Sequence, residues 1–139
     1  RKRLKSQDLN FEKTIFRKAS KPVEYSPEHL KMQKVLFESL SRKYGKRNVS
    51  LEEDWVDIKV ETDTCIILFE IKSSLNPKTV IREAFGQIME YAYHPERIYN
   101  KKVQLVIVGR SPLGLHESRY IAFLRDQFRI PLYYQDISI

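Results

Sequence analysis

The sequence predicts a mixed α/β fold, and three observations support that prediction. Two segments, Ser26-Pro27 and Asn76-Pro77, place a capping residue before a proline, which is typical of helix starts. Two short apolar runs, residues 65–69 and 103–108, are typical of strands buried on both faces of a sheet. The 139 residues are 42% hydrophobic and 31% charged, which suits one folded domain and excludes general disorder.

In the first half of the chain, we expect one helix followed by three strands. The helix begins after Ser26 and ends near Tyr44, where Gly45 stops it. Thr62-Asp63 makes a tight connection between the second and third strands. The apolar face of the helix holds Met32, Leu36, Phe37, Leu40 and Tyr44, and the three strands are Asn48–Glu53, Trp55–Glu61 and Thr64–Ser73.

In the second half, helices and strands alternate, which indicates parallel pairing through helical crossovers. A helix runs from the Asn76 cap to about Tyr93, before Pro95, and a right-handed crossover through it joins two parallel strands. The remaining elements are a strand at Val103–Val108, a helix over residues 115–129 that buries Tyr120, Ile121, Leu124 and Phe128, and a strand at Pro131–Ile137. The predicted order is therefore α-β-β-β-α-β-α-β.

The net charge of +7 is concentrated in a basic segment at the start of the chain. Residues 1–22 carry eight basic and two acidic side chains, so residues 23–139 form a nearly neutral domain with a net charge of +1. The segment either contacts phosphates or is a linker from an upstream domain. Because no initiator methionine opens the sequence, we expect a piece of a longer protein.

A carboxylate and an ammonium group stand at the end of the most apolar predicted strand. Side chains of a strand alternate between faces, so Glu70 and Lys72 point to the same side. An antiparallel hairpin closed at Thr62-Asp63 brings Asp57 of the preceding strand close to Glu70. Burying such charges is costly, so their presence indicates a function. Two carboxylates are suitable ligands for a Mg²⁺ ion.

The pattern of Asp57, Glu70 thirteen positions later and then x-Lys72 resembles the signature of the PD-(D/E)xK phosphodiesterases, the restriction-endonuclease-like superfamily. The resemblance covers about residues 26–137, and it implies an αβββαβ core with an additional C-terminal helix and strand. By this likeness, Asp57, Glu70 and the carbonyl of Ile71 would hold Mg²⁺, for which Mn²⁺ would substitute. Lys72 would orient the attacking water.

The following helix contains Gln87-x-x-x-Tyr91, with both side chains on one helical face. This element is similar to the one that the RecB-like branch of the superfamily carries at the same place. The likeness implies that Gln87 supports the catalytic groups and that Tyr91 faces the nucleic-acid backbone. The border of an ordinary amphipathic helix is the alternative explanation.

The sequence also departs from the superfamily pattern. Val56 replaces the expected proline, and we expect Glu38 to face solvent, where it could not be a metal ligand. The inward positions of the first helix are His29 and Gln33, which are polar packing groups or, alternatively, ligands. Glu53 would be a further carboxylate only if its strand runs unbroken to Asp57.

Basic residues crowd the end of the first helix, at Lys43, Lys46 and Arg47. They either complement the helix dipole or contact phosphates of a nucleic acid.

The resulting expectation is a Mg²⁺-dependent nuclease domain acting on DNA, with RNA not excluded. It would be an endonuclease module of a restriction or DNA-processing protein. A binding or assembly module on the same fold, without turnover, is the alternative. Membrane insertion is not expected, because the apolar runs are too short to cross a bilayer. The single cysteine fits a reducing, intracellular setting. We expect a cytoplasmic protein of prokaryotic origin, and homodimer formation stays open.

Overall fold

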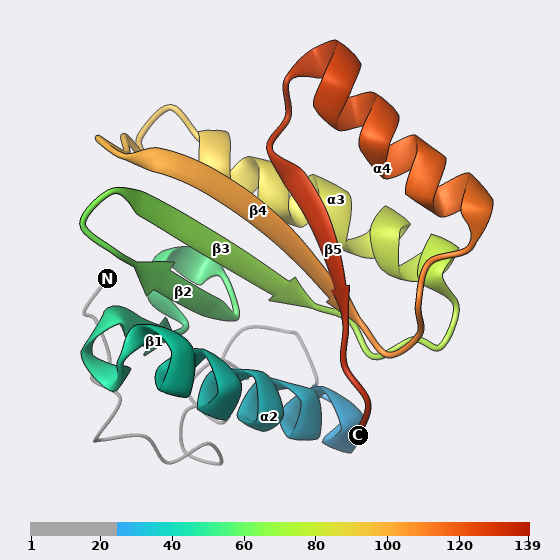
Figure 1. The fold of residues 1–139 in the computed structure, drawn as a ribbon, viewed down its shortest axis with the longest axis horizontal. Coiled ribbons are helices and arrows are strands. Elements are labelled where there is room, and N and C mark those ends of the chain that lie inside the picture. The colour runs from blue at the N-terminus through green and yellow to red at the C-terminus, as the bar shows by residue number, and fades with distance from the viewer. Residues whose placement is uncertain (1–24) are drawn as a thin grey trace.

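The structure is a computed structural model that describes residues 25–139. These residues form three helices and a five-stranded mixed sheet, which is the predicted α/β class (Figure 1). The basic segment predicted at residues 1–22 lies outside the described residues. The helices are α2 (Pro27–Tyr44), α3 (Pro77–Tyr93) and α4 (Leu115–Phe128), and the strands are β1 (Val49–Leu51), β2 (Ile58–Glu61), β3 (Cys65–Ile71), β4 (Lys102–Gly109) and β5 (Leu132–Asp136).

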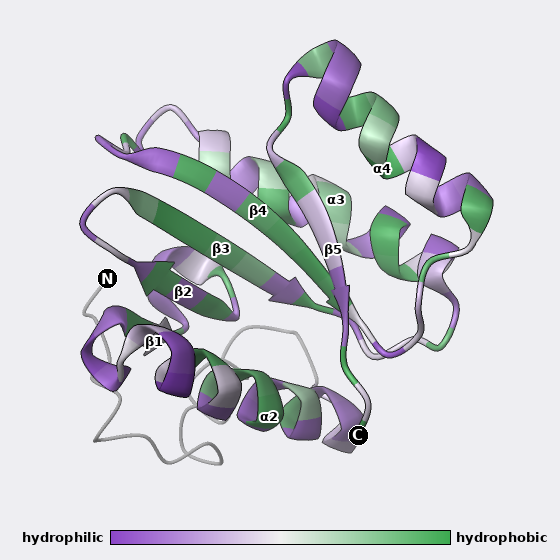
Figure 2. Cartoon of the chain, in the orientation of Figure 1, coloured by the Kyte–Doolittle hydropathy of each residue, from purple (hydrophilic) through white to green (hydrophobic). Residues whose placement is uncertain are grey.

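The strands are ordered β1-β2-β3-β4-β5 across the sheet, the same order as in the chain. β1, β2 and β3 form an antiparallel meander, whereas β4 pairs with β3 and β5 pairs with β4 in parallel. The parallel pairing of β3 with β4 across α3 confirms the predicted crossover connection. β3 thus lies at the centre of the sheet, and Figure 2 shows its hydrophobic length ending in a hydrophilic carboxyl end.

Helices cover both faces of this sheet. Met32, Leu36 and Leu40 of α2 pack on one face against Ile67 and Phe69 of β3, among other residues. The second face is covered by α3 and α4, whose core residues include Val80, Ala84, Ile88, Ile121 and Leu124. Among residues 25–139, no helix combines the length and the apolar character needed to cross a bilayer.

The helix ends follow the local sequence signals. The Ser26 hydroxyl accepts a hydrogen bond from the His29 amide (3.1 Å), and Gly45 ends α2 with a φ of 88°, a conformation that favours glycine. The Asn76 side chain accepts hydrogen bonds from the amides of Lys78 and Thr79 at the start of α3. These caps confirm the two predicted helix starts.

The predicted strands before Asp57 are too long. Residues 53–55 form a 3-10 turn rather than a strand, and β2 begins only at Ile58. Glu52, Asp54 and Trp55 have φ values of 60°, 56° and 73°, in the left-handed region that L-residues rarely adopt. The strain of this conformation costs on the order of 1 kcal/mol of folding free energy for each such residue. The turn contains no glycine, so its sequence does not indicate the left-handed conformation.

The predicted buried face of α4 is half wrong. Ile121 and Leu124 are buried, but Tyr120 and Phe128 are 47% and 63% exposed. Tyr120 is turned by about 100° from Ile121 around the helix axis. Phe128 closes the helix and packs edge-on against the exposed Phe123, with a distance of 5.8 Å between ring centroids. α4 therefore buries a narrower stripe than its sequence indicates.

Candidate active site

Asp57 lies opposite Glu70, just beyond the end of the β2–β3 pairing that is farther from the Thr62-Asp63 connection. Ile58 is the register partner of Phe69. Next to this pair, the Asp57 amide donates to the Phe69 carbonyl (3.1 Å), and the Ile71 amide donates to Asp57 Oδ2 (2.8 Å). These two hydrogen bonds bracket Glu70, so the two acids sit on adjacent backbone segments.

The alternation of side chains breaks at Asp57. Ile58 and Val60 pack on the α2 side of the sheet, as expected for strand alternation, but Val56 packs on the α3 side. Strand alternation through the sequence VDIKV predicts that Val56 points the same way as Ile58 and Val60, and this prediction is wrong because the 3-10 turn at residues 53–55 interrupts the strand. Asp57 stands at this interruption, where its carboxylate reaches both the Ile71 amide and α2.

Two buried side chains of α2 contact Asp57. His29 Nε2 lies 3.3 Å from Asp57 Oδ2, and the Tyr25 ring packs against the imidazole with 4.3 Å between centroids. Gln33 Nε2 donates to the Asp57 carbonyl (3.1 Å) and is fully buried. The sequence placed both residues inward, and the structure adds that their common target is Asp57. Glu38, in contrast, is exposed, as expected.

Glu70 and Lys72 form an ion pair at the carboxyl end of β3. Lys72 Nζ lies 3.6 Å from Glu70 Oε1, and Glu70 is only 4% exposed. Glu70 shares its strand face with Ile66 and Leu68, which pack on the α3 side. A buried carboxylate is costly without a partner, so the ammonium group of Lys72 offsets part of its desolvation.

The end of β3 is also anchored to its neighbours. The Lys72 amide donates to the Val108 carbonyl of β4 (2.9 Å), and the Ser26 hydroxyl donates to the Ser73 hydroxyl (3.1 Å). The second contact joins the start of α2 to the segment that follows Lys72. Helix α2, β3 and β4 are thereby fixed around the candidate site.

The donor groups suit a hard divalent cation. Carboxylate and carbonyl oxygens are the ligands that Mg²⁺ prefers, and Asp57, Glu70 and Ile71 supply them. Among residues 25–139, however, no group of three or more His, Cys, Asp or Glu side chains is close enough together to hold a metal ion. Among these residues, Asp57 and Glu70 are therefore not part of a preformed three-residue cluster: the Asp57 carboxylate contacts His29 of α2 and the Ile71 amide, and Glu70 pairs with Lys72.

Gln87 and Tyr91 lie on one side of α3, as predicted, but their surroundings differ. Gln87 Oε1 is buried and has no hydrogen-bond partner among the described residues. Tyr91 contacts Arg97, whose guanidinium lies 5.7 Å from the ring centroid and donates to the Tyr91 carbonyl (3.0 Å). Arg97 therefore contacts both the ring and the backbone carbonyl of Tyr91.

Glu53 would be a further carboxylate of the site only on a strand that runs unbroken to Asp57, and the 3-10 turn interrupts that strand. Its carboxylate pairs instead with Lys59 Nζ (3.1 Å), which also binds Asp54 (2.8 Å). Burial alone would lower the pKa of Lys59, but the hydrogen bonds that Lys59 donates to Asp54 and Glu53, together with their negative charges, outweigh burial and raise that pKa. Tyr99 donates to Asp54 (3.2 Å), and burial, with the Asp54 charge, raises the pKa of Tyr99 to about 12. Glu53 thus belongs to a separate ionic cluster.

Glu52 is the buried acid that the sequence reasoning missed. It is 2% exposed, and its amide donates to the Asp57 carbonyl (3.2 Å). Its burial depends on the left-handed turn, for which the sequence carries no signal.

The basic residues Lys43, Lys46 and Arg47 are exposed at the other end of α2. Lys43 lies 5.2 Å from the Tyr44 ring centroid. With a rise of about 1.5 Å per residue, the fourteen positions from His29 to Lys43 span roughly 21 Å. This basic cluster is therefore remote from Asp57.

Comparison with family models, with curated proteins and with solved structures found no match for this chain.

Proposed function

We propose that this chain is a metal-dependent nuclease domain that hydrolyses phosphodiester bonds in DNA. The observation that supports the proposal best is the hydrogen bonding of Asp57, which brackets Glu70 while Lys72 stands 3.6 Å from the Glu70 carboxylate. The element order from α2 to β4 also agrees with the αβββαβ core of the restriction-endonuclease-like superfamily.

Asp57, Glu70 and the Ile71 carbonyl would hold Mg²⁺, which, when bound, polarises the phosphodiester and favours ionisation of a bound water. His29 and Gln33 position Asp57 through its carboxylate and its carbonyl. Lys72, which is partly exposed, orients the attacking water and stabilises negative charge that develops on the phosphate. Gln87, from α3, is the further polar group that supports this cluster.

The test is cleavage of plasmid DNA by Lys72→Ala in Mg²⁺. Because the ammonium group acts on charge that develops in the transition state, we expect the rate to fall by about 10²–10³-fold. Lys102→Ala is the matched control, since Lys102 is exposed at the start of β4, the end of the sheet opposite to Lys72. Circular dichroism should show that both variants stay folded. Cleavage by Lys72→Ala at the wild-type rate would refute the proposal.

The alternative is a module that binds nucleic acid without cleaving it. It is favoured by one observation, the lack of a three-residue metal cluster among residues 25–139. Binding of DNA or RNA with no cleavage in either Mg²⁺ or Mn²⁺ would support this alternative. Including both nucleic acids in the assay also determines which of them is bound.

A further inference from the structure

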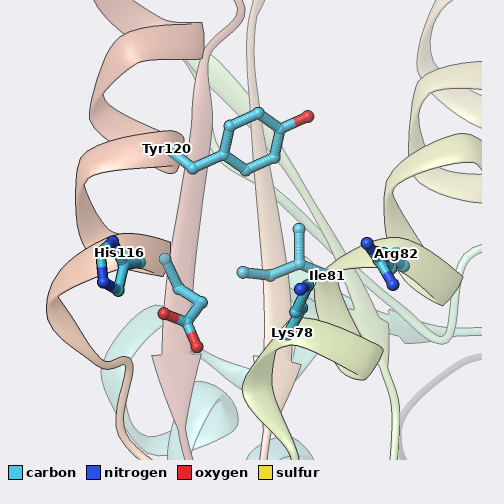
Figure 3. Close-up of a pocket in the computed structure, with 6 residues that line it drawn as sticks. Lys78, Ile81, Arg82, His116 and Tyr120 are labelled. Carbon is cyan, nitrogen blue, oxygen red and sulfur yellow. The ribbon is translucent and has the colours of Figure 1, made fainter.

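An open groove of about 470 Å³ lies between α3 and α4, apart from Asp57 and its neighbours. Figure 3 shows that the two helices each provide one wall. The α3 wall consists of Lys78, Ile81 and Arg82, and the α4 wall consists of His116, Glu117 and Tyr120.

The α3 wall of the groove carries two exposed cations. Lys78 and Arg82 are exposed, and neither forms an ion pair among residues 25–139. The acid across the groove, Glu117, lies back over the start of α4, because a Cβ added at Gly114 would be 3.3 Å from Glu117 Oε2. A carboxylate there interacts favourably with the helix N-terminus. The two cations are thus available to an anion such as a phosphate group.

An aromatic ring stands above an apolar floor in the same groove. Tyr120 is 47% exposed, although its sequence pattern predicts burial, and Ile81 beneath it is buried. In Figure 3 the ring extends from α4 toward α3, over Ile81. An exposed ring of this kind offers a flat surface on which a nucleic-acid base can stack.

The groove is connected to the candidate active site by short, fixed loops. Lys78 lies six positions after Lys72, so the Cα atoms of these two residues are at most about 22 Å apart. The Ser111 hydroxyl donates to the Leu75 carbonyl (2.8 Å), and Arg110 reaches the Ser73 carbonyl (3.5 Å). Lys72, Arg110, Lys78 and Arg82 therefore form a basic path from the end of β3 to the groove.

We infer that the α3–α4 groove binds one nucleotide of the substrate strand, with its phosphate at Lys78 and Arg82 and its base stacked on Tyr120. The inference rests on the proposed function, because it takes the substrate to be a nucleic acid. It adds a binding position outside the cleavage site and predicts a preference for strands whose bases are unpaired near that position, since a paired base cannot stack on the ring.

The test is the affinity for a short fluorescent single-stranded oligonucleotide, measured by anisotropy in EDTA so that no cleavage occurs. We expect Lys78→Ala/Arg82→Ala to weaken binding about tenfold or more and to lower the slope of log affinity against log salt by about one. Lys31→Ala/Lys34→Ala removes the same charge from the exposed face of α2, on the other side of the sheet, and should change affinity less than twofold.

The stacking contact has its own test. Tyr120→Ala should weaken binding by about five- to 150-fold, whereas Tyr120→Phe should retain affinity, because the ring and not the hydroxyl stacks on the base. An oligonucleotide that carries only abasic sites should bind wild type and Tyr120→Ala equally.

The inference is overturned if the groove variant binds as tightly as the α2 control, or if Tyr120→Ala binds like the wild type. Failure of the proposed function has a different result. In that case the wild type would bind through the groove in EDTA, yet neither Mg²⁺ nor Mn²⁺ would produce cleavage.

Discussion

Asp57 has two separable roles, and replacing it by asparagine or by alanine distinguishes them. Its carboxylate accepts the Ile71 amide at 2.8 Å and lies 3.3 Å from His29 Nε2, while the residue itself is 1% exposed. Asparagine retains a side-chain oxygen that can accept from the Ile71 amide, but it removes the negative charge. Alanine removes both the oxygen and the charge.

The expected loss in the free energy of unfolding follows from the hydrogen-bond donors that lose their acceptor. A buried donor without a partner costs about 1–3 kcal/mol, and Asp57→Ala affects the Ile71 amide and His29. We therefore expect Asp57→Ala to lower the free energy of unfolding by about 2–6 kcal/mol. At about 4 °C per kcal/mol, Tm falls by roughly 8–24 °C. Asp57→Asn should cost about 1 kcal/mol or less, since its side-chain oxygen still accepts from the Ile71 amide and the smaller desolvation cost of a neutral amide compensates for the weaker hydrogen bond.

The assay combines urea unfolding without metal and plasmid cleavage with Mg²⁺. Both variants should lose cleavage, because both lack the charge, while only Asp57→Ala should lose substantial stability. Equal stability of the two variants would refute the assigned acceptor role of the carboxylate. Wild-type cleavage by Asp57→Asn would refute the need for its charge.

Three further predictions concern residues outside the candidate active site. Lys59→Met should lower the free energy of unfolding by about 2–3 kcal/mol, measured in urea, because Glu53 and Asp54 lose the ammonium group that they share, whereas Glu61 keeps Lys101. A loss below about 0.5 kcal/mol, which is the effect of a surface substitution, would contradict this role. Burial favours a higher pKa for Asp54, but the hydrogen bond and charge of Lys59 lower that pKa below its ordinary value of 3.8. The stability that this ion pair contributes is therefore present above pH 3.8 and should be lost as the pH falls through the pKa of Asp54 in the folded state. A Tm that is level across this range in wild type, or that declines equally in Lys59→Met, would argue against the pair. Gly109→Ala should cost about 1–3 kcal/mol, because the new methyl group collides with the Tyr134 hydroxyl, which donates to the Ser111 carbonyl at 2.6 Å. Adding Tyr134→Phe should recover part of that loss, and strictly additive effects would exclude the collision.

The sequence predicted the elements that depend on local signals. The caps at Ser26 and Asn76 fixed the starts of two helices, and the apolar run at residues 103–108 identified a strand that is buried and parallel to β3. Asp57 and Glu70 could also be placed as neighbours, because a tight turn at Thr62-Asp63 determines which residues of a hairpin face each other.

The features that the sequence could not predict depend on tertiary contacts. The contact between His29 and Asp57 joins residues 28 positions apart, and helical periodicity showed only that His29 points inward. The left-handed turn at Glu52 and Asp54 contains no glycine, and the strands were therefore expected to continue to Glu53 and to resume at Trp55. Tyr120 was assigned to the core because an aromatic residue beside Ile121 usually lies there, whereas the structure leaves its ring at the edge of the groove.

The agreement between strand order in the sheet and strand order in the chain has a consequence for biosynthesis. A chain leaves the ribosome from its amino end at about 5–20 residues per second, and domains fold as they emerge. Here each new strand finds its neighbour already made, and no strand must be inserted between two earlier ones. A chain that has emerged only as far as α4 lacks the outer strand β5, yet it already holds β3, with Glu70, between both of its partners.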